Sequence, residues 1–318
     1  MAIPSLYRML LLVTLALSML GCNDSPHPPL KIGTNVWPGY EPLYLSRELG
    51  YLDRKQGQLV ELLSASEVIR AYRNGALDVA ALTLDELLLL REGGIAAQVL
   101  LITDTSYGAD AIIAREARTV AELKGQRIGV ETNALGAYML SRALNRAGLT
   151  SSDVEIVSLE ANQHEEAFLR GSVDAVVTFE PMRSRLLESG GVEVFNSRRI
   201  PDEVIDLLVV RPEIVENRPE QLAQLLDVWF RSVDYLTTQP AKAHALMSTR
   251  LRLTPEQVSQ ALTDIRIPDR QRNQLMIYKE PSMLLQQAKR MYEVMNTRHL
   301  ISRPVDLHDL VVPQGIWE

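Results

Sequence analysis

Apolar and polar positions follow one another in the same order in two segments of the chain, residues 31–86 and residues 127–181. In each segment a short apolar run containing Ile-Gly leads through a polar turn into an amphipathic stretch, and further apolar runs follow. Three pairs of residues share a spacing of 96: Gly33 and Gly129, Gly75 and Gly171, and Asp78 and Asp174 (129 − 33, 171 − 75 and 174 − 78). We interpret each segment as strand, helix, strand, helix, strand, and expect two similar lobes with a cleft between them. The similarity would come from duplication or from the same order of strands and helices arising without it.

The remaining apolar runs extend this prediction to the rest of the chain. The pattern predicts strands at residues 30–33, 59–63, 79–82, 97–102 and 204–210, and helices at residues 41–49, 67–74, 85–92, 219–237, 240–250, 255–263 and 281–296. Lobe one would take residues 30–112 and lobe two residues 113–204, and residues 205–318 would return to lobe one and add C-terminal helices. The predicted fold class is α/β, with a mostly parallel βαβ-built sheet flanked by helices in each lobe.

The first residues have the pattern of a secretory signal. Residues 1–21 contain one basic residue, Arg8, and then an apolar run at 9–20, which is shorter than the ~20 residues of a membrane span. Cys22 is the single cysteine of the 318 residues, and the preceding Leu-Gly resembles the end of a bacterial lipobox. We therefore expect lipid attachment at Cys22 and a polar tether at residues 22–29; the alternative is a free thiol after an ordinary signal.

The net charge limits the choice of partner. The chain has a formal charge of −7, and loss of residues 1–21 removes one positive charge, Arg8, to give −8. This mild acidity argues against nucleic acid or an anionic bilayer as the partner, because both reward a basic patch. The single cysteine also excludes a disulfide within the chain and a thiolate metal site.

Candidate ligand-binding residues lie at the predicted strand ends, because ligands of open α/β sheets bind beyond the carboxyl ends of the strands. Trp37 and Tyr40 follow the first strand and offer flat faces to a ring, a methyl group or a cation, although Trp37 could equally pack in the core. Others stand at helix starts, where capping is the default role, or in a predicted polar loop at 104–110. The candidates are Trp37, Tyr40, Thr83, Asp85, Tyr107, Asp110, Glu131, Thr132, Asn133 and Glu180.

The predicted strand ends are strongly acidic. They carry Asp85, Asp104, Asp110, Glu131, Glu160 and Glu180, with no arginine or lysine except Arg183 inside a following helix. An oxyanion would require arginine or lysine, so this polarity favours a cationic or amine-bearing ligand, with an aromatic cage formed by Trp37, Tyr40 and Tyr107. The helix start at residues 132–136 keeps an anion site open as the alternative. Glu180, which precedes a proline, could instead serve the hinge or the closure of the lobes.

Four stretches resemble a known family. Residues 31–50, the Gly-x-x-Asp motif that ends at Asp78, the Leu-Lys-Gly-Gln-Arg-Ile-Gly run at 123–129 and the Phe-Glu-Pro sequence at 179–181 resemble the nitrate/sulfonate/taurine-type solute-binding proteins of ABC importers. Related chains bind thiamine-pyrimidine precursors. The resemblance implies a two-lobed periplasmic-binding-protein-like fold of type II that closes on a small polar solute, including an aminopyrimidine. It also implies an ABC permease as partner, a monomer, and a lipid-anchored place on the extracytoplasmic face of a bacterial membrane.

Enzyme chemistry has little support in the sequence. None of the five histidines (His27, His164, His244, His299 and His308) stands near a predicted strand end with a nucleophile, and no His-Glu-x-x-His or Gly-x-Ser-x-Gly motif occurs. His164 belongs to a His-Glu-Glu triplet that predicts a solvated helix face more readily than a metal site. We expect no catalytic residue, metal or cofactor. Two alternatives remain open: a carboxylate-using lyase-type enzyme of the same fold, and a ligand sensor for a membrane signalling protein.

Overall fold

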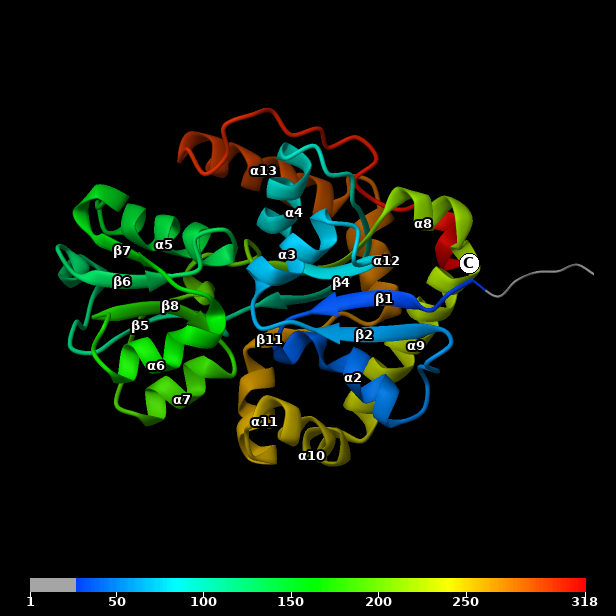
Figure 1. Ribbon diagram of the computed structural model, residues 1–318, viewed down its shortest axis with the longest axis horizontal. Coiled ribbons are helices and arrows are strands. Elements are labelled where there is room, and N and C mark those ends of the chain that lie inside the picture. Colours follow the sequence, from blue (N-terminus) through cyan, green and yellow to red (C-terminus); the bar gives the residue numbers. More distant parts are fainter. Residues whose placement is uncertain (1–26) are drawn as a thin grey trace, which may run out of the picture.

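The computed structural model describes residues 27–318, which form two separate β-sheets with helices on both faces of each (Figure 1). The first sheet has the strand order β11-β4-β10-β3-β1-β2 and the second the order β7-β6-β8-β5-β9. The strands of the first sheet are β1 (Leu30–Thr34), β2 (Gly57–Glu61), β3 (Val79–Thr83), β4 (Gln98–Ser106), β10 (Ile205–Val210) and β11 (Ile265–Arg266). Those of the second are β5 (Asp110–Ala114), β6 (Arg127–Val130), β7 (Glu155–Ser158), β8 (Ala175–Phe179) and β9 (Val192–Asn196).

The two sheets repeat one arrangement. β1 pairs in parallel with β2 and β3, as β6 pairs in parallel with β7 and β8. The register is also the same, because Ile32 lies opposite Val79 and Ile128 opposite Ala175. Each parallel set then meets one antiparallel strand, β10 on β3 and β5 on β8. The two strand-and-helix segments predicted from the sequence pattern are therefore confirmed as two similar α/β lobes.

The repeated aspartates have the same structural role in both lobes. Asp78 accepts a hydrogen bond from the backbone N–H of Lys31 at 2.8 Å, and Asp174 accepts one from that of Arg127 at 2.9 Å. Both donors are strand residues next to the turn that carries the aspartate, so each carboxylate satisfies an N–H at a strand end. The 96-residue repeat at these positions therefore reflects the construction of the sheet.

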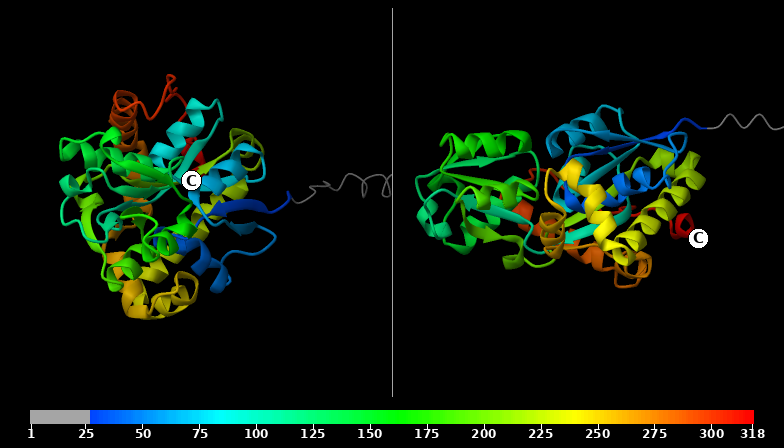
Figure 2. Two further views of the ribbon diagram at one scale, coloured as in Figure 1. Left: turned by 60° about the vertical axis from the view of Figure 1, so that its left-hand side comes forward. Right: turned by 90° about the horizontal axis from the view of Figure 1, so that it is seen from below.

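Helices cover both faces of each sheet and add a C-terminal layer to the first (Figures 1 and 2). α3 (Ala65–Arg73) and α4 (Leu84–Glu92) lie on one face of the first sheet and α2 (Glu41–Glu48) on the other, while α5 (Leu135–Arg146) lies opposite α6 (His164–Leu169) and α7 (Met182–Glu188) on the second. The C-terminal helices are α8 (Pro212–Asn217), α9 (Pro219–Thr238), α10 (Pro240–Leu251), α11 (Pro255–Thr263), α12 (Arg270–Tyr278) and α13 (Met283–Thr297). α9 packs on α2 and α13 on α4, which joins this region to lobe one.

The structure differs from the prediction in four respects. Each sheet is mixed and not mostly parallel, because the pairs β10–β3, β10–β4 and β11–β4 are antiparallel in the first sheet and β5–β8 and β5–β9 in the second. The stretch at 104–110 is not a polar loop, because β4 continues to Ser106 and β5 begins at Asp110, with a tight turn between them. The expected lobe boundary at 112/113 falls inside β5, so the change of sheet lies at residues 107–109. α8 and α12 were not predicted, and α13 begins two residues late because Ser282 caps it by accepting from the Leu285 N–H at 3.3 Å.

Candidate functional site

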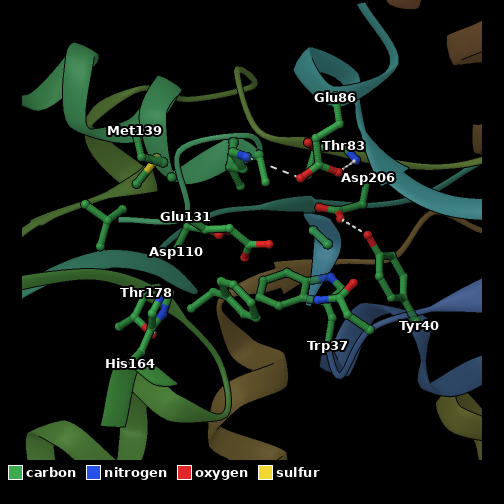
Figure 3. A pocket seen from close by; sticks show the side chains of 17 residues that line it. Trp37, Tyr40, Thr83, Glu86, Asp110, Glu131, Met139, His164, Thr178 and Asp206 are labelled. Carbon is green, nitrogen blue, oxygen red and sulfur yellow. Dashed lines mark hydrogen bonds between the residues drawn. The ribbon is translucent and has the colours of Figure 1, made fainter. Parts of the chain in front are cut away.

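A cavity lies between the lobes, at the ends of the strands (Figure 3). Lobe one contributes Asn35, Trp37, Tyr40, Ala65, Thr83, Glu86 and Asp206, and lobe two contributes Asp110, Glu131, Ala134, Leu135, Gly136, Met139, His164, Val177, Thr178 and Phe179. Because both lobes line it, a solute in this cavity would contact both at once. Five of the ten candidates from the sequence come together here: Trp37, Tyr40, Thr83, Asp110 and Glu131.

Trp37 and Tyr40 are held in place by buried carboxylates. The Trp37 Nε1–H donates to Asp104 Oδ2 at 3.1 Å, and the Tyr40 hydroxyl donates to Asp206 Oδ1 at 2.6 Å. Gly39 lies between the two aromatics, and a Cβ there would be 1.9 Å from Asp104 Oδ2. The Pro-Gly turn after β1 is therefore required for this close approach.

Four carboxyl side chains line the cavity and are almost completely buried: Glu86, Asp110, Glu131 and Asp206 are 2%, 3%, 4% and 3% exposed. Burial raises the pKa of Asp110 to about 7, and burial together with the charge of Asp85 raises the pKa of Glu86 to about 8. Burial also raises the pKa values of Glu131 and Asp206, and the charge of Asp104 adds to that of Asp206. Within residues 27–318, no lysine or arginine lines this cavity.

Two of these carboxylates bridge the lobes through helix starts. Glu131 of lobe two accepts from the Ser66 N–H at the start of α3 at 2.7 Å. In the other direction, Glu86 of lobe one accepts from the Leu135 N–H at the start of α5 at 3.2 Å, and also from its own Thr83 N–H at 2.9 Å. Free N–H groups at a helix start are a ready anion site. Here the protein's own carboxylates occupy that position on both sides of the cleft.

The other sequence candidates lie outside the cavity. Asp85, Thr132 and Asn133 line a neighbouring groove between the lobes, and Asp85 accepts a 2.7 Å hydrogen bond from the Thr83 hydroxyl. Tyr107 does not line the cavity, and the guanidinium carbon of Arg266 lies 3.7 Å from its ring centroid. The predicted aromatic cage of Trp37, Tyr40 and Tyr107 is therefore wrong, because Tyr107 already stacks on a cation of the protein.

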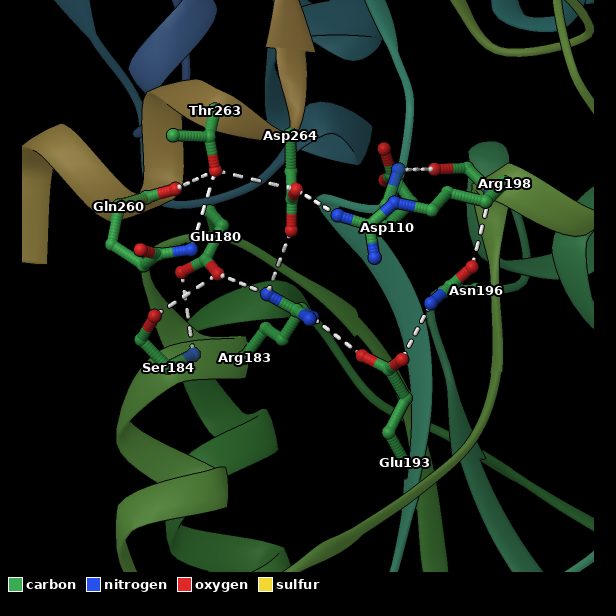
Figure 4. A network of polar contacts seen from close by, with 12 residues as sticks. Asp110, Glu180, Arg183, Ser184, Glu193, Asn196, Arg198, Gln260, Thr263 and Asp264 are labelled. Carbon is green, nitrogen blue, oxygen red and sulfur yellow. Dashed lines mark hydrogen bonds and ion pairs between the residues drawn. The ribbon is translucent and has the colours of Figure 1, made fainter.

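Glu180 belongs to a polar network next to the cavity (Figure 4). It is fully buried, accepts from Arg183 at 2.9 Å and from the Ser184 hydroxyl at 3.0 Å. Arg183 also pairs with Glu193 at 2.7 Å and with Asp264, at the end of α11, at 3.4 Å. This network joins lobe two to the C-terminal region of lobe one, which fits the hinge or closure role that the sequence left open for Glu180.

Sequence reasoning missed three functional candidates. Glu86 was overlooked because its place in the capping box of α4 hid the fact that its carboxylate crosses to α5. Asp206 stands at the beginning of the antiparallel strand β10, opposite Thr83 and Asp104, whereas only carboxyl ends were considered; a lone acid in an apolar run was the available signal. His164 was placed on a solvated helix face, and this is wrong, since it is 1% exposed and lines the cavity.

A sequence model of the NMT1-like family matches residues 23–251. The chain belongs to the NMT1-like family. A provisionally named binding protein of Brucella abortus (strain 2308) is 28% identical over 250 residues, which cover 74% of this chain and 76% of the relative. The taurine-binding periplasmic protein of Escherichia coli (strain K12) is 26% identical over 161 residues, or 49% of this chain and 50% of the relative.

Solved structures show the same fold. The alkanesulfonate-binding protein SsuA of Xanthomonas axonopodis pv. citri, bound to MOPS, matches with a TM-score of 0.76 at 18% identity, over 89% of this chain and 97% of SsuA. The desulfurization enzyme DSZB matches with a TM-score of 0.65 at 19% identity, over 90% of this chain and 97% of DSZB. Receptors and an enzyme share this architecture, so the match identifies the fold and leaves the activity to the site. The predicted two-lobed periplasmic-binding-protein fold is confirmed.

Residues 27–318 contain neither a helix that could cross a membrane nor a side-chain cluster that could hold a metal ion. No helix in that range is both long and apolar enough to span a membrane. The same range contains no group of three or more histidine, cysteine, aspartate or glutamate side chains arranged to hold a metal ion. The predicted signal at residues 1–21 and the lipidation site at Cys22 lie outside the described residues.

Proposed function

We propose that this protein is an extracytoplasmic solute-binding receptor of an ABC importer, and that its ligand is a small amine-bearing cation. The periplasmic-binding-protein fold and the NMT1-like family support the receptor role. The charge of the inter-lobe cavity supports the cation. In this proposal the protein is a monomer, is anchored by lipid at Cys22, and delivers the solute to a membrane permease.

The single observation that carries the choice of ligand is a cavity with four buried carboxyls and no basic side chain among the described residues. Buried carboxyls resist ionisation, which the raised pKa values of Glu86 and Asp110 reflect. A cation placed among them would favour their charged forms. An oxyanion would instead meet developing negative charge and would find the starts of α3 and α5 already bound to Glu131 and Glu86.

Closure follows from the same geometry. The lobes touch where Glu86 of α4 accepts from the start of α5 and where Glu131, after β6, accepts from the start of α3, so both sides of the cleft supply carboxylates that line the cavity. A cation that contacts both lobes stabilises the closed form selectively, because the open form separates these acceptors. The permease would then recognise the closed receptor.

The test is a thermal-shift screen of the purified protein against amines, aminopyrimidines, sulfonates and nitrate. A ligand at about 100 times its Kd should add ~2.7 kcal/mol to the free energy of unfolding, which moves the midpoint by degrees. We expect shifts from amines or aminopyrimidines. Shifts from sulfonates or nitrate alone would reject the cationic ligand and leave the receptor role intact.

An amino-sulfonate is the second candidate ligand, since one relative is named for taurine, which carries both an ammonium and a sulfonate. A second pocket between the lobes shares Asn35 and Phe179 with the cavity and is lined by Arg185, Arg250 and Arg252. Arg250 and Arg185 are already paired with glutamates, which weakens the case for an anion there. Taurine and its amine-free analogue ethanesulfonate, compared in the same screen, separate the two candidates.

Other roles of this fold remain secondary. A lyase-type enzyme would need a proton-transfer group beside a reactive position, and burial lowers the pKa of His164, the histidine at the cavity, to about 4, which makes it a weak base. A sensor for a membrane signalling protein would bind the same ligand in the same cavity. Reconstitution with a permease distinguishes transport from sensing, because only the transport receptor would stimulate ATP hydrolysis when loaded.

A further inference from the structure

His164 reaches the cavity from behind β8. It is the first residue of α6 and is 1% exposed, and its Nδ1 lies 3.3 Å from the Thr178 hydroxyl. Its ring meets that of Phe179 edge to face, with 6.4 Å between the centroids. The other ring nitrogen, Nε2, has no hydrogen-bond partner among residues 27–318. A buried nitrogen at the cavity wall is therefore left without a partner.

Asp110 presents a second atom of this kind. Its Oδ2 is buried and has no hydrogen-bond partner in the described part of the chain. Asp110 lies opposite Phe179 in the register of β5 and β8, and Ala111 lies opposite Thr178. Since side chains alternate along a strand, Asp110 and Phe179 share one face of the sheet and Thr178 and His164 the other. The two unpartnered atoms thus flank the end of β8 (Figure 3).

Their position distinguishes these two atoms from other buried polar atoms. Among residues 27–318, six buried side-chain atoms lack a partner: Asp104 Oδ1, Asp110 Oδ2, His164 Nε2, Gln221 Oε1, Trp229 Nε1 and Trp317 Nε1. Of these six residues, Asp110 and His164 line the cavity. A buried polar atom left unpaired is unfavourable, because it has lost its hydrogen bonds to water. A ligand that pairs both atoms would recover that free energy on binding.

The protonation state of His164 determines whether the ligand must supply a hydrogen-bond donor or an acceptor. Burial lowers the pKa of the imidazole to about 4. The ring is therefore neutral at physiological pH. We place its one proton on Nδ1, the nitrogen with neighbours, which leaves Nε2 as an acceptor. Asp110 Oδ2 is likewise an acceptor when its carboxyl is ionised.

We propose that His164 Nε2 and Asp110 Oδ2 form a paired acceptor subsite, and that the ligand carries N–H donors at two separate positions. This inference rests on the proposed function, because the ammonium would lie at Asp110 and the other carboxylates. A second N–H would then reach His164. The body of the ligand would lie along Phe179 and Trp37, whose rings meet edge to face with 6.0 Å between centroids. Quaternary ammonium compounds, which have no N–H, are poor ligands.

Three matched cations test this subsite by isothermal titration calorimetry on the purified full chain. Benzyltrimethylammonium has charge and no N–H, benzylammonium has N–H groups at one end, and aminobenzylamine (meta and para isomers) adds a second N–H group. We expect benzylammonium to bind about tenfold tighter than benzyltrimethylammonium, and the better aminobenzylamine isomer about tenfold tighter again, since each matched hydrogen bond is worth about 1–1.5 kcal/mol.

Variants of His164 locate the second contact. In His164→Leu the affinity ratio of aminobenzylamine to benzylammonium should fall from about ten to about one, and His164→Gln, which keeps a polar group, should retain part of it. Melting curves of both variants report whether the fold is intact, and the Gln variant serves as the test if the Leu variant unfolds.

Three results would overturn the inference. Equal binding of benzyltrimethylammonium and benzylammonium rejects the requirement for N–H donors, and an unchanged ratio in both His164 variants rejects the contact with His164. Either result leaves the cationic ligand standing. If benzenesulfonate binds and none of the three cations does, the cationic ligand of the proposed function fails, and the subsite fails with it.

Discussion

Two groups of buried carboxylates in this protein differ in whether a side chain of the protein supplies their counter-charge. At the edge of the lobes, Glu41 pairs with Arg250 and Glu180 with Arg183 at 2.9 Å, so the protein supplies the cation. In the cavity, Glu86, Asp110 and Glu131 are as deeply buried and line a surface that carries no basic side chain from the described residues. A carboxylate paired with a cation of the protein holds the fold together, whereas one without a counter-charge is available to an external cation.

The pKa values of these carboxyls reflect both their burial and the charges of neighbouring side chains. Burial raises the pKa of Glu41 to about 7 even though Arg250 lowers it, whereas Glu86 has Asp85 beside it and rises to about 8. Burial is the largest cause in both cases, and the neighbour decides the rest. Depth of burial alone therefore does not identify a binding site, whereas a missing counter-charge does.

The largest effect is expected from removal of an internal cation. Arg250→Ala should lower the free energy of unfolding by about 3 kcal/mol, because it leaves Glu41 buried without its partner. Urea denaturation measures the change. The double variant Arg250→Met with Glu41→Gln is the control and should recover much of the loss. If Arg250→Ala has the stability of the wild type, the carboxylates with an internal cation do not depend on it, and the distinction from the cavity carboxylates fails.

The cavity carboxylates should respond in the opposite way. Asp110→Asn and Glu131→Gln should weaken the binding of an amine ligand about 10–100-fold while the unliganded protein keeps its stability or gains some, since a buried group that resists ionisation is replaced by a neutral one. Calorimetric titration and melting curves measure both. Asp174→Asn, a carboxylate that bonds the N–H of Arg127 and does not line the cavity, is the control and should bind within about twofold of the wild type. Equal losses in all three variants would contradict the assignment.

The pH dependence should distinguish a cation from an anion. The pKa values of Asp110 and Glu86, about 7 and about 8, lie above the usual ~4 of unfolded carboxyls. The folded protein without ligand therefore binds more protons than the unfolded chain, and its stability should fall as pH rises from about 4 to about 8. A bound cation favours ionisation, so amine affinity should rise by up to about tenfold per pH unit for each proton released. Affinity that falls with pH would indicate an anionic ligand.

The smallest effect is expected at the repeated aspartates. Asp78→Asn and Asp174→Asn should each lower the free energy of unfolding by about 1 kcal/mol, because each loses a charge-assisted bond to the N–H of a strand residue. Ligand affinity should stay within about twofold. A loss of binding in either variant would place a functional carboxylate outside the cavity and contradict the distinction between structural and ligand-binding carboxylates.

The sequence was enough to predict the two-lobed fold and part of the candidate binding site. The repeat of Gly33 and Asp78 at Gly129 and Asp174, together with strand and helix periods that are local signals, predicted two similar lobes. The rule that ligands bind at strand ends identified five residues that line the cavity: Trp37, Tyr40, Thr83, Asp110 and Glu131. It did not locate Asp206, which starts an antiparallel strand. Tyr107 was included wrongly because its stacking on Arg266 joins residues far apart in the chain.

Strand and helix patterns and the positions of acids along the chain are properties of short segments, so they were enough to predict two α/β lobes with acidic strand ends. Which of these acids remain without a cation depends on the packing of distant segments. Glu86 reaches α5 and Glu131 reaches α3 only because the lobes face each other, and His164 is buried only because α6 packs behind β8. The counter-charge of a buried group depends on residues distant in sequence, and no local pattern encodes it.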